Sequence, residues 1–378
     1  MRVFHEPCYF AEAVYLLYNF VNGVSYEDEY MRVMRSFGYQ FLEKEDDSAI
    51  RRVHELTRVS REVTHDLDIE DRRLRYFFER LPGTDQRTGC CLAQVMLVTI
   101  PLDCSRVDDF VRQLIEGFRS MEKAGIKIND MNGMGLIVER QDAQEPAEPL
   151  SAQLERLPCG VEAKWMILRA LTEFETHVRE LTELLRPVAD RLREAMVRLV
   201  EMNEAVLQEW TVYFENHTVD DFQQEMFNTT FLFTQENVPH EIWLCLWNFN
   251  LFGTWSEWML AENSLPVRVA YIGICISFDF AAHKKQKPDE EVLSTMLRAL
   301  AGKDKLETLR RCMENPISAA RLAADMNLNS GTVSRNLYGL FKLGFLETRG
   351  DGDRVNYVTK LDSLQQLFGW VVEFVKGV

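Results

Sequence analysis

One feature constrains the fold of this chain more than any other: an apolar stripe of helical periodicity between residues 161 and 214. Its members recur at three- and four-residue spacing, which places them on one face of an α-helix. They are Trp165, Leu168, Leu171, Phe174, Val178, Leu181, Leu185, Val188, Leu192, Leu199, Val206, Trp210 and Tyr213. Pro187 predicts a kink in this helix or its division into two. Because no heptad repeat is sustained, the stripe indicates core packing or a helical dimer seam rather than a long coiled coil.

The region before this stripe, from residue 9 to about 125, is also predicted to be mostly helical. Ser48 begins one helix, and a second helix stops at Pro82. Ser105 with Asp108 has the pattern of a capping box and begins a third helix, which ends at Gly125. A short strand is expected at 136–138 and a loop at 144–149.

The composition changes abruptly between residues 226 and 280. This segment holds 12 of the 41 aromatic residues of the chain but only six charged ones. Residues 230–235, 242–251 and 267–277 have the composition of strands. The simplest interpretation is that these strands belong to the core of a large domain. A small-molecule pocket stays open as an alternative, and its first candidate residues are Trp243, Trp247, Trp255, Trp258 and His240, with Glu241 nearby.

A polar linker at 281–291 predicts the main domain boundary. We expect a sensor or assembly domain at 1–285, helical over 1–225 and with aromatic-rich strands over 226–280, and a second domain at 286–378. The formal net charge of −16 argues against nucleic acid as a partner. Residues 291–378, however, hold 12 basic and 10 acidic side chains, a net charge of +2, whereas residues 1–290 hold 31 and 49, a net charge of −18. Charge therefore leaves nucleic-acid binding open.

The carboxy-terminal module has the pattern of a helix-turn-helix. A helix at 293–313 precedes a short helix at 319–326, a polar turn at 327–331 and a second short helix at 332–343 that ends at Gly344. A β-hairpin follows, with Gly and Asp at its turn. The residues expected to face outward near the start of the second helix are Ser330, Thr332, Ser334, Arg335 and Asn336. Arg can bridge two acceptors of guanine and Asn can pair with adenine, so this set suits the reading of bases.

The module resembles the winged-helix domain of ArsR-type (arsenic-repressor) bacterial regulators. The similar positions are Leu322, Ala323, Leu328, 332–335, Leu337, 343–346 and 355–357, and the resemblance covers about 80 of the 378 residues. It implies a homodimer that binds double-stranded DNA at a two-fold symmetric operator and represses transcription until an effector binds. It also implies a phosphate contact from Lys305 and a dimer interface that includes the helix at 362–376. Phosphate contacts are further expected from Lys342, Arg349 and Arg354.

This module departs from the ArsR pattern in two ways. The turn of the hairpin carries Asp351 and Asp353, where relatives are usually basic. The helix at 317–326 has no cysteine and the final helix has no histidine, so the familiar metal sites are missing. We therefore expect an effector that is not a metal.

Several other classes of protein are disfavoured. No apolar run reaches the roughly 18 residues of a membrane span, and the amino terminus has no signal core, so we expect a cytoplasmic protein. The chain has no phosphate-binding loop, nucleophile elbow or dinucleotide glycine pattern, so we expect no enzyme and no cofactor. Adjacent Cys90 and Cys91, with Cys104 nearby, leave a metal or redox role open, but burial in an apolar segment is the simpler interpretation.

The predicted fold class is α+β and predominantly helical: a large helical domain with a small aromatic-rich β segment, followed by a winged helix-turn-helix. The predicted function is a homodimeric, ArsR-like transcriptional repressor controlled by a small-molecule effector in the amino-terminal domain. The alternative is an interaction scaffold whose winged helix contacts protein, which the acidic hairpin turn and the overall charge favour. A weaker third possibility is an enzyme with an autoregulatory head.

Overall fold

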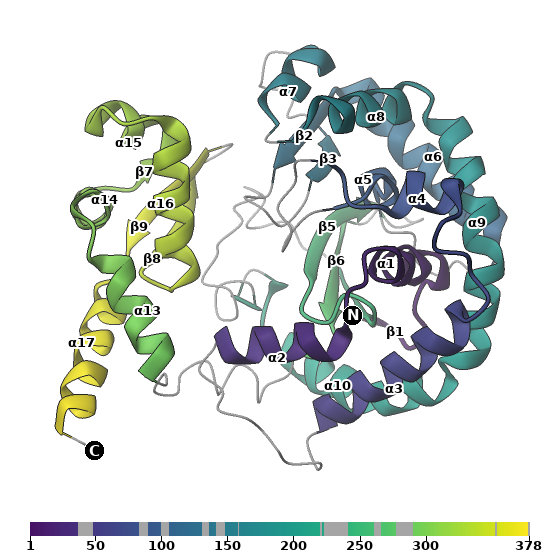
Figure 1. The fold of residues 1–378 in the computed structure, drawn as a ribbon, viewed down its shortest axis with the longest axis horizontal. Coiled ribbons are helices and arrows are strands. Elements are labelled where there is room, and N and C mark those ends of the chain that lie inside the picture. The colour runs from purple at the N-terminus through teal and green to yellow at the C-terminus, as the bar shows by residue number, and fades with distance from the viewer. Residues whose placement is uncertain are drawn as a thin grey trace.

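The structure is a computed structural model, and it describes most of the chain. The described residues are 1–36, 48–82, 90–99, 106–130, 136–140, 148–157, 159–219, 221–222, 241–260, 266–276, 290–351 and 354–376. Over these residues the chain is predominantly helical with small sheets (Figure 1), as the α+β prediction requires. No helix in these ranges is long and apolar enough to cross a membrane.

Helices dominate the first half of the chain. They are α1 (Tyr9–Val21), α2 (Tyr26–Ser36), α3 (Ser48–Thr64), α4 (Arg72–Phe78), α5 (Leu92–Met96), α6 (Val107–Ala124) and α7 (Leu150–Arg156). Helix α3 begins at Ser48 and α6 ends before Gly125, whose φ of +98° suits glycine, so both expectations are confirmed. Ser105, which we expected to begin α6, lies outside the described residues. Arg106 occupies the N-cap position instead.

The long apolar stripe forms three helices, α8 (Val161–Thr172), α9 (Phe174–Ala195) and α10 (Val197–Phe214). The breaks fall at Glu173 and Met196, so the division expected at Pro187 is wrong. Pro187 lies on the exposed face of α9, where water can satisfy the carbonyl group that the proline leaves unpaired. The stripe residues from Leu171 onward are buried, which confirms core packing. Trp165 is the main exception, with 65% of its surface exposed.

The aromatic segment contributes three strands to a four-stranded sheet. The strands are β1 (Arg2–Phe4), β4 (Glu241–Trp247), β5 (Thr254–Leu260) and β6 (Pro266–Gly273), in the order β1-β4-β6-β5. Strands β1, β4 and β6 are parallel, and β5 is antiparallel to β6. The strand expected at 242–251 ends at Trp247, because the chain turns at residues 248–252. The strand expected at 230–235 lies outside the described residues, and β1 was not expected.

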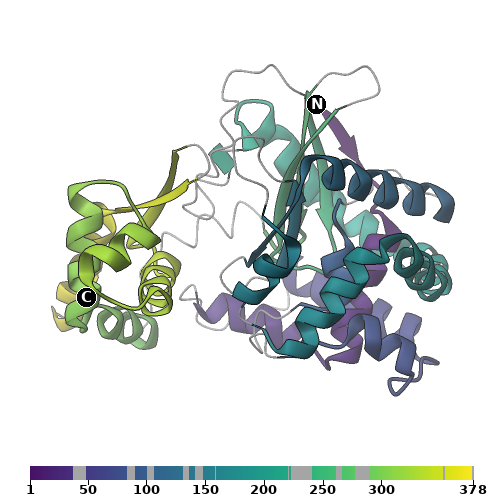
Figure 2. The same cartoon turned by 90° about the horizontal axis from the view of Figure 1, so that it is seen from above.

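Alternate residues of β4 face two different clusters of side chains. Leu244 and Leu246 join the main helical core, while Cys245 and Trp247 pack with Tyr271 in a smaller cluster that includes a residue of α1. Both Figure 1 and Figure 2 show helices gathered against this sheet. A separate two-stranded sheet joins β2 (Ile126–Asp130) to β3 (Leu136–Arg140), which confirms the strand expected at 136–138.

The carboxy-terminal elements form one group in both views (Figure 2). They are α13 (Glu290–Leu300), α14 (Lys303–Glu314), β7 (Ile317–Ser318), α15 (Ala319–Met326), α16 (Ser330–Lys342), β8 (Leu346–Asp351), β9 (Arg354–Thr359) and α17 (Leu361–Lys376). The single helix expected at 293–313 is divided, because Gly302 is extended and begins α14. The strands pair in the order β7-β9-β8. The buried residues of these elements form their own cluster, which includes Leu322, Val333 and Leu337.

Candidate functional site

The turn between α15 and α16 is fixed by side-chain caps. The Ser318 hydroxyl at the start of α15 accepts a hydrogen bond from the Arg321 amide, and α15 ends at Asn327, whose φ is +52°. The Asn329 side chain then accepts a hydrogen bond of 2.8 Å from the Gly331 amide and begins α16 at Ser330. Helix α16 therefore starts two residues earlier than expected, since an Asn N-cap is strongly favoured.

Packing of α15 against α16 decides which side chains face outward. Val333, Leu337 and Leu340 are buried. Of the five residues predicted to face outward, two are exposed and three are half-buried: Ser330 and Arg335 in the first group, and Thr332, Ser334 and Asn336 in the second. The start of α16 thus presents a short row of polar groups on the outer face of the helix pair.

Arg335 is the one cation of this row, and its side chain is exposed. Its Nε donates a hydrogen bond of 3.2 Å to the Gly331 carbonyl one turn earlier in α16. It makes no ion pair with any residue that the structure describes. The guanidinium therefore keeps four N–H donors available to an outside acceptor.

The two arginines of α14 differ from Arg335, because both are held by an ion pair. Arg310 and Arg311 both donate to the Glu307 carboxylate, over distances of 2.7 to 2.8 Å. These hydrogen bonds, first from Arg310 and then from Arg311, lower the pKa of Glu307 to about 2. Lys305, which the resemblance assigned to a phosphate, is half-buried near the start of the same helix.

The remaining predicted phosphate contacts are only partly located. Lys342 lies at the end of α16, and Arg349 and Arg354 lie in the two strands of the β8–β9 hairpin, but their side chains are outside what the structure describes. The hairpin itself is confirmed, with Asp351 opposite Arg354. Asp353 in the turn lies outside the described residues.

The four tryptophans do not come together as one described group. Trp247 is buried between Tyr15 and Tyr271, with ring centroids 5.1 and 5.5 Å away, and it belongs to the core. Trp243 lies beside Phe4, where the Arg2 guanidinium is 5.1 Å from its ring. Trp255 and Trp258 belong to β5, but the structure does not describe their side chains. His240 lies outside the described residues, so the predicted tryptophan pocket stays a prediction.

A buried polar network lies beside this sheet, and the sequence analysis missed it. The carboxylate of Glu12 in α1 accepts hydrogen bonds from the Asn248 amide at 2.8 Å, the Asn248 side chain at 2.7 Å and the Phe249 amide at 3.0 Å. Burial raises the pKa of Glu12 to about 7, and the three hydrogen bonds limit that rise. The available signal was an acid on the apolar face of α1, between Ala11 and Ala13.

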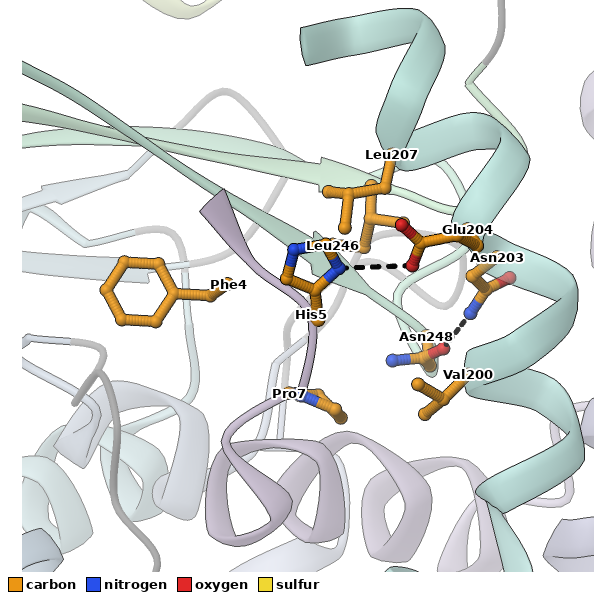
Figure 3. Close-up of a pocket in the computed structure, with 9 residues that line it drawn as sticks. All are labelled: Phe4, His5, Pro7, Val200, Asn203, Glu204, Leu207, Leu246 and Asn248. Atoms are coloured by element: carbon orange, nitrogen blue, oxygen red, sulfur yellow. Dashed lines mark hydrogen bonds and ion pairs between the residues drawn. The ribbon is translucent and has the colours of Figure 1, made fainter. Parts of the chain in front are cut away.

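This network continues into a shallow depression at the ends of β1 and β4 (Figure 3). Asn203 of α10 donates a hydrogen bond of 2.7 Å to the Asn248 side chain. Beside it, His5 Nδ1 lies 3.1 Å from the Glu204 carboxylate, and both of these side chains are exposed. The depression has room for about one water molecule.

The described residues provide neither a group of metal ligands nor a reactive thiol at Cys90 and Cys91. No group of three or more His, Cys, Asp or Glu side chains is arranged there to hold a metal ion. Cys90 and Cys91 are buried, as the simpler interpretation predicted, and burial raises the pKa of the Cys91 thiol. A thiol that stays protonated is a poor nucleophile and metal ligand. Cys104 lies outside the described residues.

Comparison of the whole chain with protein-family models, curated proteins and solved structures finds no match. Its function therefore has to be argued from the chemistry of its own residues. Two surfaces offer such chemistry: the start of α16 and the depression at the ends of β1 and β4.

Proposed function

We propose that this chain is a DNA-binding transcriptional regulator of ArsR-like type, a repressor, and that α16 is the element that reads DNA. The observation that carries the proposal is the exposed Arg335, without an ionic partner among the described residues, on a short helix held by a capped turn. An Arg in this position can bridge two acceptors of a guanine base. Hydroxyl groups of Ser330 and Thr332 at the same end of α16 supply further contacts to bases or phosphates.

A winged helix-turn-helix of this kind inserts its second helix into the major groove. The β8–β9 hairpin then lies against the DNA backbone, where Arg349 and Arg354 contact phosphates. Lys305 and Lys342 anchor the phosphates on either side of the groove. Two copies of the chain read half-sites about one helical turn, or roughly 34 Å, apart.

The homodimer is supported by the outer face of α17. This helix exposes large apolar side chains that include Phe368, 56% exposed, Val372 and Val375, 78% exposed. The resemblance assigns the equivalent helix to the dimer interface. We infer that α17 of one copy covers α17 of the other, and that a non-metal effector bound in the amino-terminal domain changes how the two reading helices are spaced.

The test compares two arginine variants in binding to DNA from upstream of the protein's own gene. Arg335→Ala should weaken selective binding by roughly 5- to 150-fold, because a bidentate contact to a base contributes about 1–3 kcal/mol. Arg310→Ala is the matched control, since Arg310 is also exposed but is held by Glu307. Fluorescence anisotropy across a salt titration separates selective from non-selective binding. Equal affinity of the two variants for the selected DNA would contradict the proposal.

A second candidate function is an interaction scaffold whose winged helix contacts protein. Two observations favour it: Glu307 holds Arg310 and Arg311, and the hairpin carries Asp351 at its turn. In the same titration, a scaffold shows no preference for any upstream sequence at low salt while the dimer stays intact.

A further inference from the structure

The first two turns of α8 expose an apolar face. Val161 is 84% exposed and Trp165 is 65% exposed, and Leu168, one turn further along the helix, is half-buried. Their spacing of four and three residues places the three side chains on one face of α8. Tryptophan is enriched where proteins contact each other, so an indole ring with this much exposed surface indicates an interface.

The opposite face of α8 holds the helix in place. Ala163 and Ile167 are fully buried in the main core, and α8 packs against α5, α7 and α9 (Figure 1). At the start of the helix, the amide of the N-cap residue Gly160 donates a hydrogen bond of 2.8 Å to the Pro82 carbonyl. Helix α8 is therefore held with Trp165 facing outward, so that a partner finds the face already ordered.

Two opposite charges flank this apolar face. Glu162 and Arg169 are both exposed. Arg169 lies 3.5 Å from Glu173, but both side chains of this ion pair are more than half exposed, and such pairs contribute little. Glu162 forms no ion pair with any residue in the ranges that the structure describes. Both charges are therefore available to a partner molecule.

The two charges are placed so that they match each other in an antiparallel pair of helices. Counted along an ideal helix, Glu162 and Arg169 lie on the same side of Trp165, about 60° and 40° around the helix axis. Along the axis they are equally far from a point midway between residues 165 and 166. A two-fold axis through that point sets Glu162 of one copy opposite Arg169 of the other, and it does so twice.

The same two-fold axis brings the apolar side chains together. Val161 and Leu168 lie on the other side of Trp165, about 40° and 60° around the helix axis. In the pair, Val161 of one copy is displaced by only two residues, or roughly 3 Å, along the axis from Leu168 of the other. The two indole rings meet at the centre, where aromatic rings stabilise each other in offset or tilted arrangements.

We propose that α8 pairs with α8 of a second copy of the chain, antiparallel and about a two-fold axis beside Trp165. A second copy is the partner that fits, because one short helix carries both the charges and the apolar side chains in positions that match themselves. This pairing involves the amino-terminal part of the chain, and it requires neither DNA nor the pairing of α17.

The face is only one helix wide, so the pairing is weak, with a Kd on the order of 100 μM. At micromolar concentration, α8 alone therefore does not hold two copies together. If α17 also pairs, the contact between the α8 helices becomes intramolecular and forms at a lower protein concentration.

Sedimentation equilibrium of the full-length Phe368→Glu variant, at concentrations up to about 500 μM, tests the proposal. This background removes any association through α17, so that the self-association that remains belongs to α8. Adding Trp165→Ser should raise the Kd at least about 10-fold, because it removes the central aromatic contact from both copies. Circular dichroism checks that each variant keeps its helix content.

Charge reversal tests the orientation of the pair. In the same background, Glu162→Arg and Arg169→Glu should each raise the Kd at least about fivefold, because each sets like charges opposite each other in two places. The double variant Glu162→Arg/Arg169→Glu restores opposite charges and should return the Kd to within about threefold of the background value. Glu201→Arg makes the same charge change at an exposed position of α10 and should leave the Kd within about twofold.

Three results would overturn the proposal. If the background variant is monomeric at about 500 μM, the face belongs to a different partner. If Glu162→Arg and Glu201→Arg have equal effects, the charge at Glu162 is not part of the contact. If the double variant associates no more tightly than the single variants, the helices are not antiparallel in this register. None of these results depends on DNA, so each leaves the proposed function to its own test.

Discussion

Glu12 has the most unusual environment of any carboxylate that the structure describes in detail. It is fully buried on α1, and its pKa is raised to about 7 from an ordinary value of 4.5. In the folded state it therefore keeps its proton up to about pH 7, whereas in the unfolded state it loses the proton near pH 4.5. Between these values the folded state binds more protons, so the free energy of unfolding falls as the pH rises.

This dependence of the free energy of unfolding on pH can be measured. The free energy of unfolding of the natural chain should decrease between pH 5 and pH 7 by on the order of 2 kcal/mol on account of Glu12. Glu12→Gln should lose this slope, because the amide does not titrate. Urea unfolding at pH 5, 6, 7 and 8 measures the slope of the free energy of unfolding against pH. Glu201→Gln, at an exposed position, is the control and should keep this slope. An unchanged slope in Glu12→Gln would show that another group titrates.

Two glycines of the carboxy-terminal module give a matched pair. A Cβ atom added at Gly339 or at Gly344 would meet no atom within 4 Å, so space does not distinguish the two positions. The backbone conformation distinguishes them, because Gly344 has a φ of +78° whereas Gly339 is helical. Gly344→Ala should lower the stability of the module by about 1–2 kcal/mol, while Gly339→Ala should raise it by about 0.5–1 kcal/mol. Thermal unfolding measures both, and shifts of the same sign would contradict the backbone argument.

At the scale of elements, the sequence predicted those whose start and stop signals are local. The helix at 319–326 and the hairpin after Gly344 are confirmed because Ser318, Asn327 and Gly344 act on their own neighbours. The breaks at Glu173 and Met196 could not be predicted, since neither residue is a helix breaker and tertiary packing decides there. Of the two candidate surfaces, only the polar row of α16 could be predicted, because its residues are close together in the sequence. The depression joins three segments that are distant in the sequence.

Helix α17 exposes an apolar face that predicts a dimer. If its exposed apolar face pairs with a second copy, Phe368→Glu should convert the dimer to a monomer, because it buries an unpaired charge in the interface. Gln366→Glu adds the same charge at another exposed position of α17 and should leave the dimer intact. Sedimentation at micromolar concentration measures both, and circular dichroism checks that the helix content is kept. A natural chain that is already monomeric would contradict the interface.

The described residues contain two large and separate clusters of buried side chains. The main helical core includes Leu56, and the cluster of the carboxy-terminal elements includes Leu337. The two clusters share no residue. The division at 1–285 and 286–378 that the sequence predicts would make them two units of folding, each with its own unfolding transition.

Calorimetry tests this division. Leu56→Ala and Leu337→Ala each remove a fully buried side chain and should cost about 2–5 kcal/mol of stability. Each variant should lower the temperature of one thermal transition and leave the other within about 2 °C, because distant sites act independently. A single transition that both variants lower equally would mean that the chain unfolds as one unit.

Strand β1 has a consequence for how the protein is made. Arg2 pairs with Trp243, so the first strand waits for its neighbour until most of the chain has been translated. At roughly 5–20 residues per second, that delay lasts roughly 10 to 50 s on the ribosome. Helices α1 to α10 emerge during this time without the sheet edge. A nascent chain stopped before Asn248 therefore contains Asn203 and Glu12 but not the turn that bonds to both of them, so the Glu12 carboxyl group cannot complete its hydrogen bonds until that turn is made.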